Sequence, residues 1–382
     1  MPNTDKIGYR PTWAEVNLNN LEHNLRQVKA FLPLGIKVLV TVKADAYGHG
    51  IVAVSKKLSA CGVDYLGVAS IDEGIKLRRA GIKTPILLLG LILKKDIQPV
   101  FTYALTPTIC DKEMAVVLNA KACALRKPIR LHIKVDTGMG RIGILHDDAF
   151  KLVKDIYKLK NVIIEGLFTH FAFADLNRKF TSYQISLFKK LVSELRGSGI
   201  IIPLVHAANS IGLIDYKDSH FTMVRPGLVI YGLHPKEGLD INLRQVLTLK
   251  SRIIFIKDVP AGYGISYGRT YITNRLTRII TLPIGYGDGY PRNLSNLAPV
   301  LIAGKRFRIC GKICMDQIMV DVGKLKPKIG DEVVLIGSQG SQRITAEELA
   351  DLSGTIPYEI VCGLGSRIPR VYKDRVKRVK GV

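Results

Sequence analysis

The sequence lacks the marks of a membrane protein and of a secreted, disulfide-rich protein. Its 382 residues include only six cysteines, scattered without a C-x-x-C pair or a metal-ligand spacing. The N-terminus has no apolar stretch of the signal-peptide type. The longest apolar segment, Ile86 to Leu93, is far too short to span a bilayer. We therefore expect a cytoplasmic protein without a bound metal. Cys314 lies within a motif, and we expect the other five cysteines to be ordinary small buried side chains.

Acidic residues are also scarce. The 32 Asp and Glu residues face 56 Lys and Arg, so the formal net charge is +24. Such an excess can indicate a nucleic-acid partner. Here the basic residues are spread along the chain, apart from a tail over 373–380, and no zinc finger, RNP-type aromatic motif or helix-turn-helix signature is present. We interpret the charge as a soluble surface that also attracts anionic small molecules, and we expect neither nucleic acid nor membrane as a partner.

Apolar residues are abundant, at 47% of the chain, so the protein can bury a sizeable core. From about residue 20 to 235, short apolar runs alternate with amphipathic segments. The clearest helix is predicted over 180–195, with Leu187, Leu191 and Leu195 on one face and Gly197 as its stop. This alternation predicts a parallel α/β fold, and its length suits a (β/α)8 barrel. The predicted strands are 38–42, 65–68, 86–89, 129–135, 162–168 and 204–206.

The pattern changes after Leu243, which divides the chain into a barrel over 1–243 and a second domain over 244–382. The second part contains β-branched runs separated by Gly and Pro, at 246–256, 278–284, 300–309, 318–322 and 332–336. One helix is predicted among them. Thr345 as its cap and Glu348 three residues later form a capping box, and the helix ends near Gly354. The second domain is therefore predicted to be β-rich.

A lysine follows the first apolar run of the barrel. Lys43 closes the run that ends at Val42, and a glycine-rich segment containing Tyr47 continues to Gly50. Active sites are built at the carboxyl ends of barrel strands. A lysine there is partly desolvated, which lowers its pKa and suits it to Schiff-base formation. An isolated lysine is more often a solvated surface residue, but a short turn before a helix is a poor place for one.

Two further runs end near basic side chains. The run that contains Lys134 is followed by two glycines and Arg141, whose guanidinium can pair with a substrate carboxylate or equally with the scaffold. Another run ends at Arg225, and Gly227 beyond it has an N–H that can meet a phosphate. The sequence thus predicts anion-binding groups at several strand ends.

Histidines mark two other strand ends. His170 follows one apolar run, and His206 ends the next, with Ser210 opening a helical segment after it. A lone histidine at a strand end is more often a core residue than a catalyst. Two of them on the same face of a barrel favour a pocket.

The second domain carries four conspicuous segments, at 263–268, 283–289, 314–317 and 356–359. The glycines at 262 and 264 do not form a dinucleotide fingerprint, because no strand–turn–helix context follows them. We predict turns there.

In their order along nearly the whole chain, these motifs resemble those of the alanine racemase family. The family fold is a (β/α)8 barrel followed by a β-rich domain, and the resemblance implies that the first strand, 12–18, joins the second domain. It also implies pyridoxal 5'-phosphate as cofactor, racemisation of alanine by two bases, and a homodimer with composite active sites. The implied product is D-alanine for peptidoglycan.

The resemblance implies a role for each motif residue. Lys43 matches the Schiff-base lysine and one base, and Tyr267 of the partner subunit matches the opposite base. Arg225 matches the arginine that faces the pyridine nitrogen, with His206 behind it and His170 linking it to the tyrosine. The other implied roles are the phosphate cradle (Tyr47, Ser210, Gly227, the Leu228 backbone, Tyr358), the substrate carboxylate contacts (Arg141, the Met315 backbone), an often carbamylated lysine that orients Arg141 (Lys134) and the entrance lining (Tyr286, Asp316).

The chemistry is compatible with these roles. Racemisation needs a proton donor on each face of a planar carbon, and a lysine and a tyrosine meet that need. A free tyrosine has a pKa of about 10, so it needs a positive network nearby. An arginine at the pyridine nitrogen leaves that nitrogen unprotonated, which weakens the cofactor as an electron sink and limits side reactions.

One departure from the family motif and several alternatives remain. The motif often has Arg three residues before the methionine, where this chain has Lys312, which puts fine substrate selection in doubt. A serine or broad-specificity racemase shares the catalytic pair. A decarboxylase of the same fold type would place a carboxylate at the pyridine nitrogen, which Arg225 contradicts. A non-catalytic protein of cofactor homeostasis would resemble the barrel alone.

Overall fold

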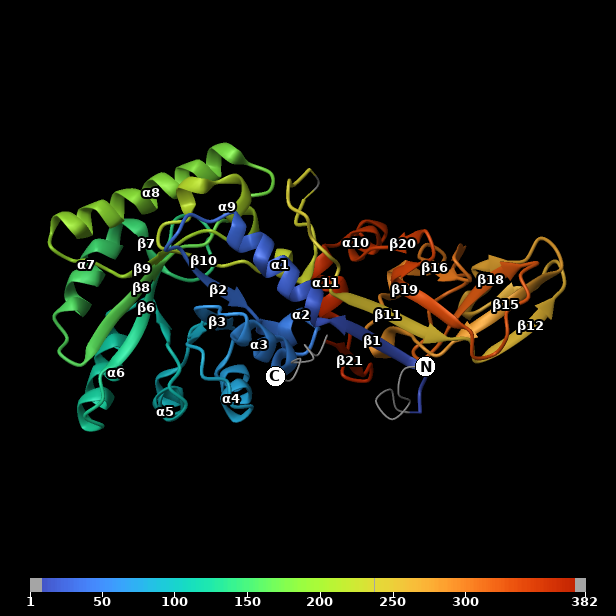
Figure 1. Cartoon of the computed structure of the whole chain (residues 1–382), viewed down its shortest axis with the longest axis horizontal. Coiled ribbons are helices and arrows are strands. Elements are labelled where there is room, and N and C mark those ends of the chain that lie inside the picture. Colours follow the sequence, from blue (N-terminus) through green and yellow to red (C-terminus); the bar gives the residue numbers. More distant parts are fainter. Residues whose placement is uncertain (1–8, 237, 375–382) are drawn as a thin grey trace, which may run out of the picture.

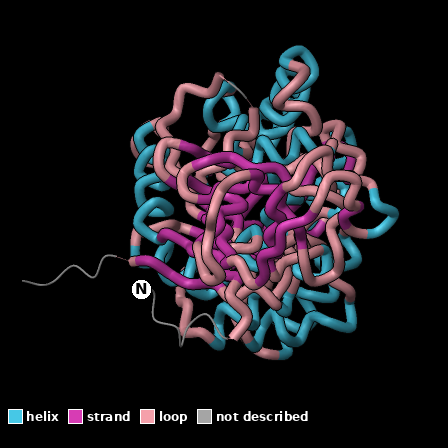
Figure 2. Tube along the Cα trace, turned by 90° about the vertical axis from the view of Figure 1, so that its right-hand side faces the viewer, coloured by secondary structure: helices cyan, strands magenta, loops and turns pink. Residues whose placement is uncertain are grey.

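The computed structural model describes residues 9–236 and 238–374, which form two lobes that meet near the middle of the molecule (Figure 1). The lobe drawn at the left contains the blue to green strands and their helices, apart from the dark blue β1 (Thr12–Asn17), which runs into the lobe at the right. The lobe at the right contains the orange and red strands. Figure 2 looks at the second lobe from its end, with its strands in front of the helices of the first.

The first lobe is a closed barrel of parallel strands. Their apolar runs are buried on both faces, as parallel strands covered by helices require. The strands pair in the orders β10-β2-β3-β4 and β5-β6-β8-β9. The Leu88 N–H donates to the Thr106 carbonyl across one seam, and the Thr222 N–H donates to the Val205 carbonyl across the other. The predicted (β/α)8 barrel is confirmed. Its strands are β2 (Lys37–Thr41), β3 (Tyr65–Val68), β4 (Ile86–Leu88), β5 (Thr108–Ile109), β6 (Ile129–Asp136), β8 (Val162–Phe168), β9 (Leu204–His206) and β10 (Met223–Val224), and a short β7 (Ile144–Leu145) pairs with β6.

Helices surround the barrel. The predicted helix over 180–195 is longer in the structure, because the Asn177 side chain accepts the Phe180 N–H and starts it earlier. Leu191 and Leu195 are buried as expected, whereas Leu187 is half-buried. The helices are α1 (Leu18–Ala30), α2 (Lys43–Tyr47), α3 (Ile51–Ala60), α4 (Ile71–Arg79), α5 (Ile97–Thr102), α6 (Lys112–Ala124), α7 (His146–Tyr157), α8 (Arg178–Gly197) and α9 (Ser210–Asp215), with the 3-10 turns η2 (Lys94–Asp96), η3 (Lys217–Ser219) and η4 (Leu228–Tyr231).

The second lobe is built on a sheet that includes the start of the chain. Strand β1 (Thr12–Asn17) lies between β11, with which it is antiparallel, and β21, with which it is parallel. The sheet order is β17 (Lys305–Arg308), β16 (Pro299–Ile302), β19 (Glu332–Gln339), β11 (Leu247–Arg252), β1 and β21 (Arg370–Lys373), with β20 (Gln342–Ile344) on β19. Strands β12 (Phe255–Val259), β15 (Thr277–Leu282) and β18 (Ile318–Gly323) form another sheet, and β13 (Gly264–Ile265) pairs with β14 (Tyr271–Ile272). Short 3-10 turns are η5 (Tyr267–Arg269), η6 (Tyr286–Asp288) and η7 (Arg292–Leu294).

Two predicted strands are each divided in the structure. The run 246–256 becomes β11 and β12, which belong to different sheets. The run 300–309 becomes the hairpin β16–β17, which turns through positive φ angles at Ala303 (+49°) and Gly304 (+72°). A continuous β-branched run does not reveal where a chain leaves one sheet for another.

The helical part of the second lobe was underpredicted. Helix α10 (Ala346–Ser353) begins where the Thr345 hydroxyl accepts the Glu348 N–H, but the reciprocal bond of a capping box is absent. The Glu348 carboxylate instead pairs with Arg306. A second helix, α11 (Pro357–Cys362), was missed because its 6 residues make fewer than two turns.

The expectation for the cysteines was wrong for four of the five. Cys310 is buried, Cys123 is exposed, and Cys61, Cys110 and Cys362 are half-buried. Over 9–236 and 238–374, no cluster of His, Cys, Asp and Glu is placed to hold a metal ion. The helices of that same part of the chain are all too short or too polar to cross a membrane.

Candidate active site

The basic residues singled out in the barrel gather at the carboxyl ends of its strands. His170 follows β8, His206 ends β9 and Arg225 follows β10. Because these strands are parallel, their carboxyl ends open on the same side. Burial lowers the pKa of His170 well below its usual range, and the charges of nearby basic residues lower it further: Arg225, Lys134, Arg141 and Lys43. The mouth of the barrel is therefore strongly positive.

Lys43 begins a left-handed helical turn that no sequence pattern predicted. Residues 44–47 all have φ between +52° and +55°. This conformation costs an L-residue about 1–2 kcal/mol. The Glu73 carboxylate accepts the first N–H of the turn at 2.6 Å, and Arg370 of the second lobe donates to the Gly48 carbonyl at 2.9 Å. The surrounding structure thus maintains a strained turn at the lysine, as functional sites often do.

The environment of Lys43 favours the neutral form of its amine. It is half-buried, and desolvation, then the charge of Arg141, lowers its pKa. A lowered pKa makes the neutral amine, the form that acts as nucleophile and base, more available. Burial raises the pKa of the neighbouring Cys362 to about 11, so that side chain stays a thiol and does not compete.

Tyr47, Ser210 and Gly227 converge on a small space beside η4. The Gly227 N–H donates to the Ser210 hydroxyl at 3.0 Å. A Cβ added to Gly227 would lie 3.0 Å from the Tyr47 hydroxyl oxygen and 4.0 Å from Ser210 Oγ. The Tyr358 ring, on α11, lies 5.6 Å from that of Tyr47, measured between centroids. Two hydroxyls and a backbone N–H around a space that glycine leaves open form a cradle for an anionic group.

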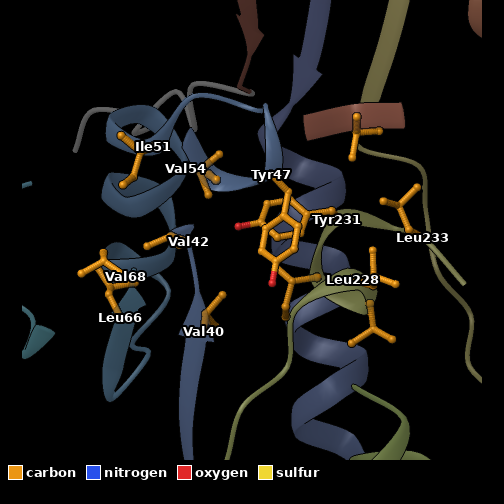
Figure 3. Close-up of a cluster of buried hydrophobic side chains, with 14 of the residues drawn as sticks. Val40, Val42, Tyr47, Ile51, Val54, Leu66, Val68, Leu228, Tyr231 and Leu233 are labelled. Atoms are coloured by element: carbon orange, nitrogen blue, oxygen red, sulfur yellow. The ribbon is translucent and has the colours of Figure 1, made fainter. Parts of the chain in front are cut away.

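Apolar packing holds Tyr47 in this place. Figure 3 shows its ring beside Tyr231 and Leu228, facing Val40 of β2. The Tyr47 and Tyr231 centroids are 4.9 Å apart, and the Tyr231 hydroxyl donates to the Thr41 carbonyl at 2.9 Å. Burial raises the pKa of Tyr47, so its hydroxyl keeps its proton and can donate.

Arg225 is a buried cation whose donors are directed by the barrel. Its Nη1 donates to His206 Nδ1 at 2.7 Å, and its Nη2 donates to the carbonyls of Thr169 at 2.6 Å and Ala207 at 2.9 Å. His170 Nδ1 lies 3.4 Å from the same Nη2. Burial lowers the pKa of Arg225 to about 9, so it remains charged at neutral pH. Among the described residues, no carboxylate forms an ion pair with it.

Lys134 is buried beside these groups without a partner. Its Nζ has no hydrogen bond within the described chain and lies 4.9 Å from the centroid of the Phe168 ring. Burial, then the charges of Arg225 and Arg141, lowers the pKa of Lys134 well below its ordinary value. An isolated amine between two guanidinium groups is a costly arrangement unless something anionic joins it.

Arg141 stands exposed at the end of a rigid turn. The Asp136 carboxylate accepts the backbone N–H groups of Gly138 at 2.8 Å and Gly140 at 2.9 Å. Burial acts to raise the pKa of Asp136, but these bonds outweigh it and lower the pKa. The turn therefore presents Arg141 to the mouth of the barrel on a defined backbone.

The other predicted site residues surround a separate hollow on the second lobe. Tyr267, on η5, is 68% exposed, and Met315 is 53% exposed. The open hollow between them has a volume of about 510 Å³ and is lined by Ser266, Tyr267, Cys314, Met315, Asp316 and Gln317. Ser266 has a φ of +63° and donates from its hydroxyl to the Lys312 carbonyl at 2.6 Å. Arg367 Nη2 donates a hydrogen bond to the Asp316 carboxylate at 2.6 Å. Tyr286, on the same lobe, is exposed.

Within one chain, the structure does not bring Lys43 and Tyr267 together. All residues that line the hollow belong to the second lobe. Strands β12 and β15, which bracket Tyr267 in the sequence, lie at the end of the molecule away from the barrel, whereas α2 lies near the junction of the lobes (Figure 1). The predicted site is thus divided into two half-sites.

Sequence reasoning missed two polar residues inside the barrel. His132 Nδ1 lies 3.0 Å from His206 Nε2, and the Glu165 carboxylate lies 3.7 Å from His132 Nε2. A signal was present, because His132 stands two residues before Lys134 in a buried strand and so shares its face. Glu165, between apolar residues of β8, carried no comparable signal.

Comparisons with known proteins match both lobes. The family model described as alanine racemase, N-terminal domain, matches residues 16–235, and the model for the C-terminal domain of alanine racemase matches 246–372. The alanine racemase of Halothermothrix orenii is 48% identical over 371 residues, which cover 96% of this chain and 98% of that protein. The solved structure of alanine racemase from Clostridium difficile 630 has a TM-score of 0.92 at 40% identity, with 96% of this chain and 97% of that chain covered. A Bacillus anthracis alanine racemase structure with bound L-Ala-P has a TM-score of 0.89 at 36% identity, with 96% of each chain covered.

Proposed function

Because this chain belongs to the alanine racemase family, we propose that it interconverts L- and D-alanine, using pyridoxal 5'-phosphate held by Lys43. The observation that carries the proposal is the strand-end arrangement of the barrel. A partly desolvated lysine, an anion cradle and a buried arginine lie around one mouth. We also propose that its D-alanine supplies peptidoglycan synthesis in the cytoplasm.

The residues present fit the cofactor. The hydroxyls of Tyr47 and Ser210 and the backbone N–H groups of Gly227 and Leu228 would hold the phosphate, and the absence of a Cβ at Gly227 keeps the approach to these donors open. Tyr358 closes the side of this cradle. Arg225 would face the pyridine nitrogen, and its position is maintained by His206. An arginine there argues against a decarboxylase, which would use a carboxylate.

The chain's own residues would move the proton. When bound, the cofactor supplies the electron sink that makes the α-proton of alanine acidic. Lys43 on one face and Tyr267 of the partner subunit on the other would each take or give a proton at that carbon. The exposed Arg141 and the Met315 backbone would hold the substrate carboxylate, and such a two-point contact orients the α-carbon between the bases.

His170 would connect the tyrosine to the rest of the site. Its Nδ1 lies against Arg225, and its Nε2 has no hydrogen-bond partner among the described residues. Its lowered pKa keeps the ring neutral, and because Nδ1 accepts from Arg225 the proton is on Nε2, which would donate to the oxygen of a tyrosine. The positive mouth behind it would favour ionisation of that hydroxyl.

Lys134 fits the proposed carbamylation. Its amine is buried and unpaired, and its lowered pKa favours the neutral form. The neutral Nζ can attack carbon dioxide, so that an N–C bond forms and one proton leaves to solvent. The resulting carbamate anion would neutralise the repulsion from Arg141 and orient its guanidinium.

A homodimer would complete the site. The half-site around Tyr267 is exposed and includes several large apolar side chains, among them Tyr263, Tyr267, Ile272 and Met315. Burial of such a face against the barrel mouth of a second copy would remove it from water and bring the two bases together. Tyr286 and Asp316 would then line the entrance.

A chiral assay tests the function. The purified protein with added pyridoxal 5'-phosphate is incubated separately with L-alanine, D-alanine and L-serine, and the enantiomers are separated. We expect both alanine enantiomers to approach a one-to-one ratio. Conversion of serine at a rate comparable to alanine would instead support a broad-specificity racemase, for which Lys312 is the motivating departure. No conversion of either amino acid contradicts the proposal.

A covalent trap tests the role of Lys43 independently of turnover. Borohydride should fix the cofactor to the protein, and peptide mass spectrometry should locate it on Lys43. The other lysines of the chain serve as internal controls. A label on any of them in place of Lys43 would refute the assignment.

A further inference from the structure

Arg225 is the first member of a chain of buried polar side chains that crosses the barrel interior. His206 Nδ1 accepts from Arg225 at 2.7 Å, and His206 Nε2 lies 3.0 Å from His132 Nδ1. His132 Nε2 lies 3.7 Å from Glu165 Oε2, which is an electrostatic contact and not a hydrogen bond, because neither atom has a hydrogen-bond partner among the described residues. The other carboxylate oxygen of Glu165 accepts from Arg130 at 3.3 Å. Both imidazoles are fully buried, and the Glu165 side chain is only 10% exposed. We call Arg225, His206, His132 and Glu165 the buried relay.

Arg225 at one end and Glu165 at the other fix the direction in which the N–H groups of the buried relay point. A guanidinium only donates, so His206 Nδ1 must accept and its proton must be on Nε2. That Nε2–H then donates to His132 Nδ1, which places the His132 proton on Nε2, directed at Glu165. A carboxylate attracts an N–H and repels a lone pair, so the electrostatic contact at 3.7 Å favours the same His132 tautomer. Each imidazole is held in its tautomer by two neighbours together, the donor on its Nδ1 side and the acceptor or anion on its Nε2 side.

The protonation states agree with this reading. Burial, then the charge of Arg225, lowers the pKa of His206 well below its ordinary value, and burial lowers the pKa of His132. Both rings are therefore neutral. Burial acts to raise the pKa of Glu165, but His132, Tyr65 and Arg130 outweigh it and lower that pKa. The buried relay thus runs from a cation to an anion through two neutral rings.

The backbone is shaped to admit His132. A Cβ on Gly166, the residue after Glu165, would overlap the His132 ring, so only glycine fits there. The pairing of β6 with β8 also shifts its register between Leu131 and His132. An apolar residue of ordinary size at 132 and a regular ladder would be the simpler barrel interior. Two local accommodations at the same point indicate that the imidazole is specifically required.

We infer that His132 and Glu165 are positioning residues for the reaction. They hold His206 in the tautomer that accepts from Arg225, and they supply the buried anion that the site around Arg225 lacks. No hydrogen bond or ion pair among the described residues joins either one to Lys43 or to the phosphate cradle, so they act through His206 and Arg225. The inference rests on the proposed function, because it is at the cofactor ring that the orientation and charge of Arg225 matter.

Histidine tautomers in the cofactor-free protein test the buried relay without any reaction. Nitrogen-15 NMR of the eight histidines distinguishes a protonated from an unprotonated ring nitrogen. We expect His206 and His132 each to show a single Nε2–H tautomer from pH 6 to 9. In His132→Phe, which keeps a ring but no nitrogen, the buried Nε2–H of His206 loses its acceptor. The ring should then leave Arg225 in part of the population, and its signal should become a mixture of tautomers. His132→Gln restores one acceptor and one donor and should restore the single His206 tautomer.

Steady-state kinetics of the cofactor-loaded variants test the consequence. For His132→Phe we expect kcat to fall about tenfold to a hundredfold, with KM within about threefold, because Arg225 acts on the transition state more than on alanine binding. His132→Gln should recover most of that loss. Thr108→Val is the matched control, since Thr108 pairs with His132 across β5 and β6 and its buried hydroxyl has no hydrogen-bond partner among the described residues. It should change neither the tautomers nor kcat.

A second variant keeps the test decisive if His132→Phe does not fold. Glu165→Leu leaves both histidines in place and removes the terminal anion, so the His132 tautomer should become mixed and kcat should fall about threefold to tenfold. Wild-type tautomers and wild-type kcat in the folded variants would overturn the inference. A wild-type protein that shows the predicted tautomers but does not racemise alanine would overturn the proposed function while the relay geometry stands.

Discussion

Mixing two inactive variants tests the division of the site between subunits. Lys43→Ala removes the base on the barrel, and Tyr267→Ala removes the base on the second lobe. In the structure these residues belong to separate half-sites, and Tyr267 is 68% exposed on a face that the barrel of its own chain does not cover. If the site is shared, each variant homodimer lacks one base at both of its sites. Both should then be essentially inactive.

The expected recovery follows from the symmetry of a dimer. Mixing the two variants at fractions x and 1−x produces heterodimers in a proportion 2x(1−x). A heterodimer has one site with both bases and one site with neither. The active fraction of all sites is therefore x(1−x), with a maximum of about a quarter at equal input if subunits reassort at random. A site within one chain predicts zero at every ratio.

A matched dilution experiment needs no rescue. Wild type at fraction x is mixed with the double variant that carries both Lys43→Ala and Tyr267→Ala. In a shared site every heterodimer is inactive at both sites, so activity should follow x². In a site within one chain it should follow x. At equal input a shared site predicts about a quarter of wild-type activity, whereas a site within one chain predicts about a half.

The assay measures D-alanine formed from L-alanine after the subunits have re-equilibrated, with differently tagged subunits to show that exchange has occurred. Circular dichroism controls for folding of each variant. If exchange is complete, recovery stays at zero and the dilution curve is linear, the shared site is wrong and Tyr267 is not the second base of a partner subunit.

Three further predictions concern single positions. Gly227→Ala should raise the Kd of the apoenzyme for pyridoxal 5'-phosphate about tenfold to a hundredfold, because its Cβ would lie 3.0 Å from the Tyr47 hydroxyl. Fluorescence titration measures this Kd. Gly197→Ala is the control, since its Cβ would meet no atom within 4 Å and should leave the Kd unchanged. Tyr267→Ala should abolish α-proton exchange of L-alanine in D₂O while some exchange of D-alanine survives, and equal residual exchange by NMR would contradict the two-base scheme. The folded pKa of Lys134 lies below its unfolded value of 10.5, so the unfolded state binds more protons and stability is lost as pH falls from 10.5 toward the folded pKa. Lys134→Met should therefore be more stable than the apoenzyme in urea at pH 7 without carbon dioxide, and the difference should shrink as pH rises toward 10.5. A less stable variant would refute this.

The amino-acid sequence by itself determined the architecture of the barrel and the place of several motif residues at its strand ends. The alternation of apolar runs and amphipathic segments reflects strands buried on both faces, so it predicts the barrel from local patterns alone. Motif residues such as Lys43, Ser210 and Arg225 follow those runs, and the geometry of parallel strands places them at one mouth. These inferences need only periodicity, which is a property of neighbouring residues.

Other features were decided by tertiary structure alone, because they depend on contacts between distant segments. The left-handed turn at 44–47 is maintained by Glu73 and Arg370, and no local propensity favours it. The run 246–256 divides because its two halves pair with different strands, β1 and β15. His132 and Glu165 acquire a role only where the barrel closes around His206, since an interior polar chain is defined by facing strands and not by spacing along the sequence.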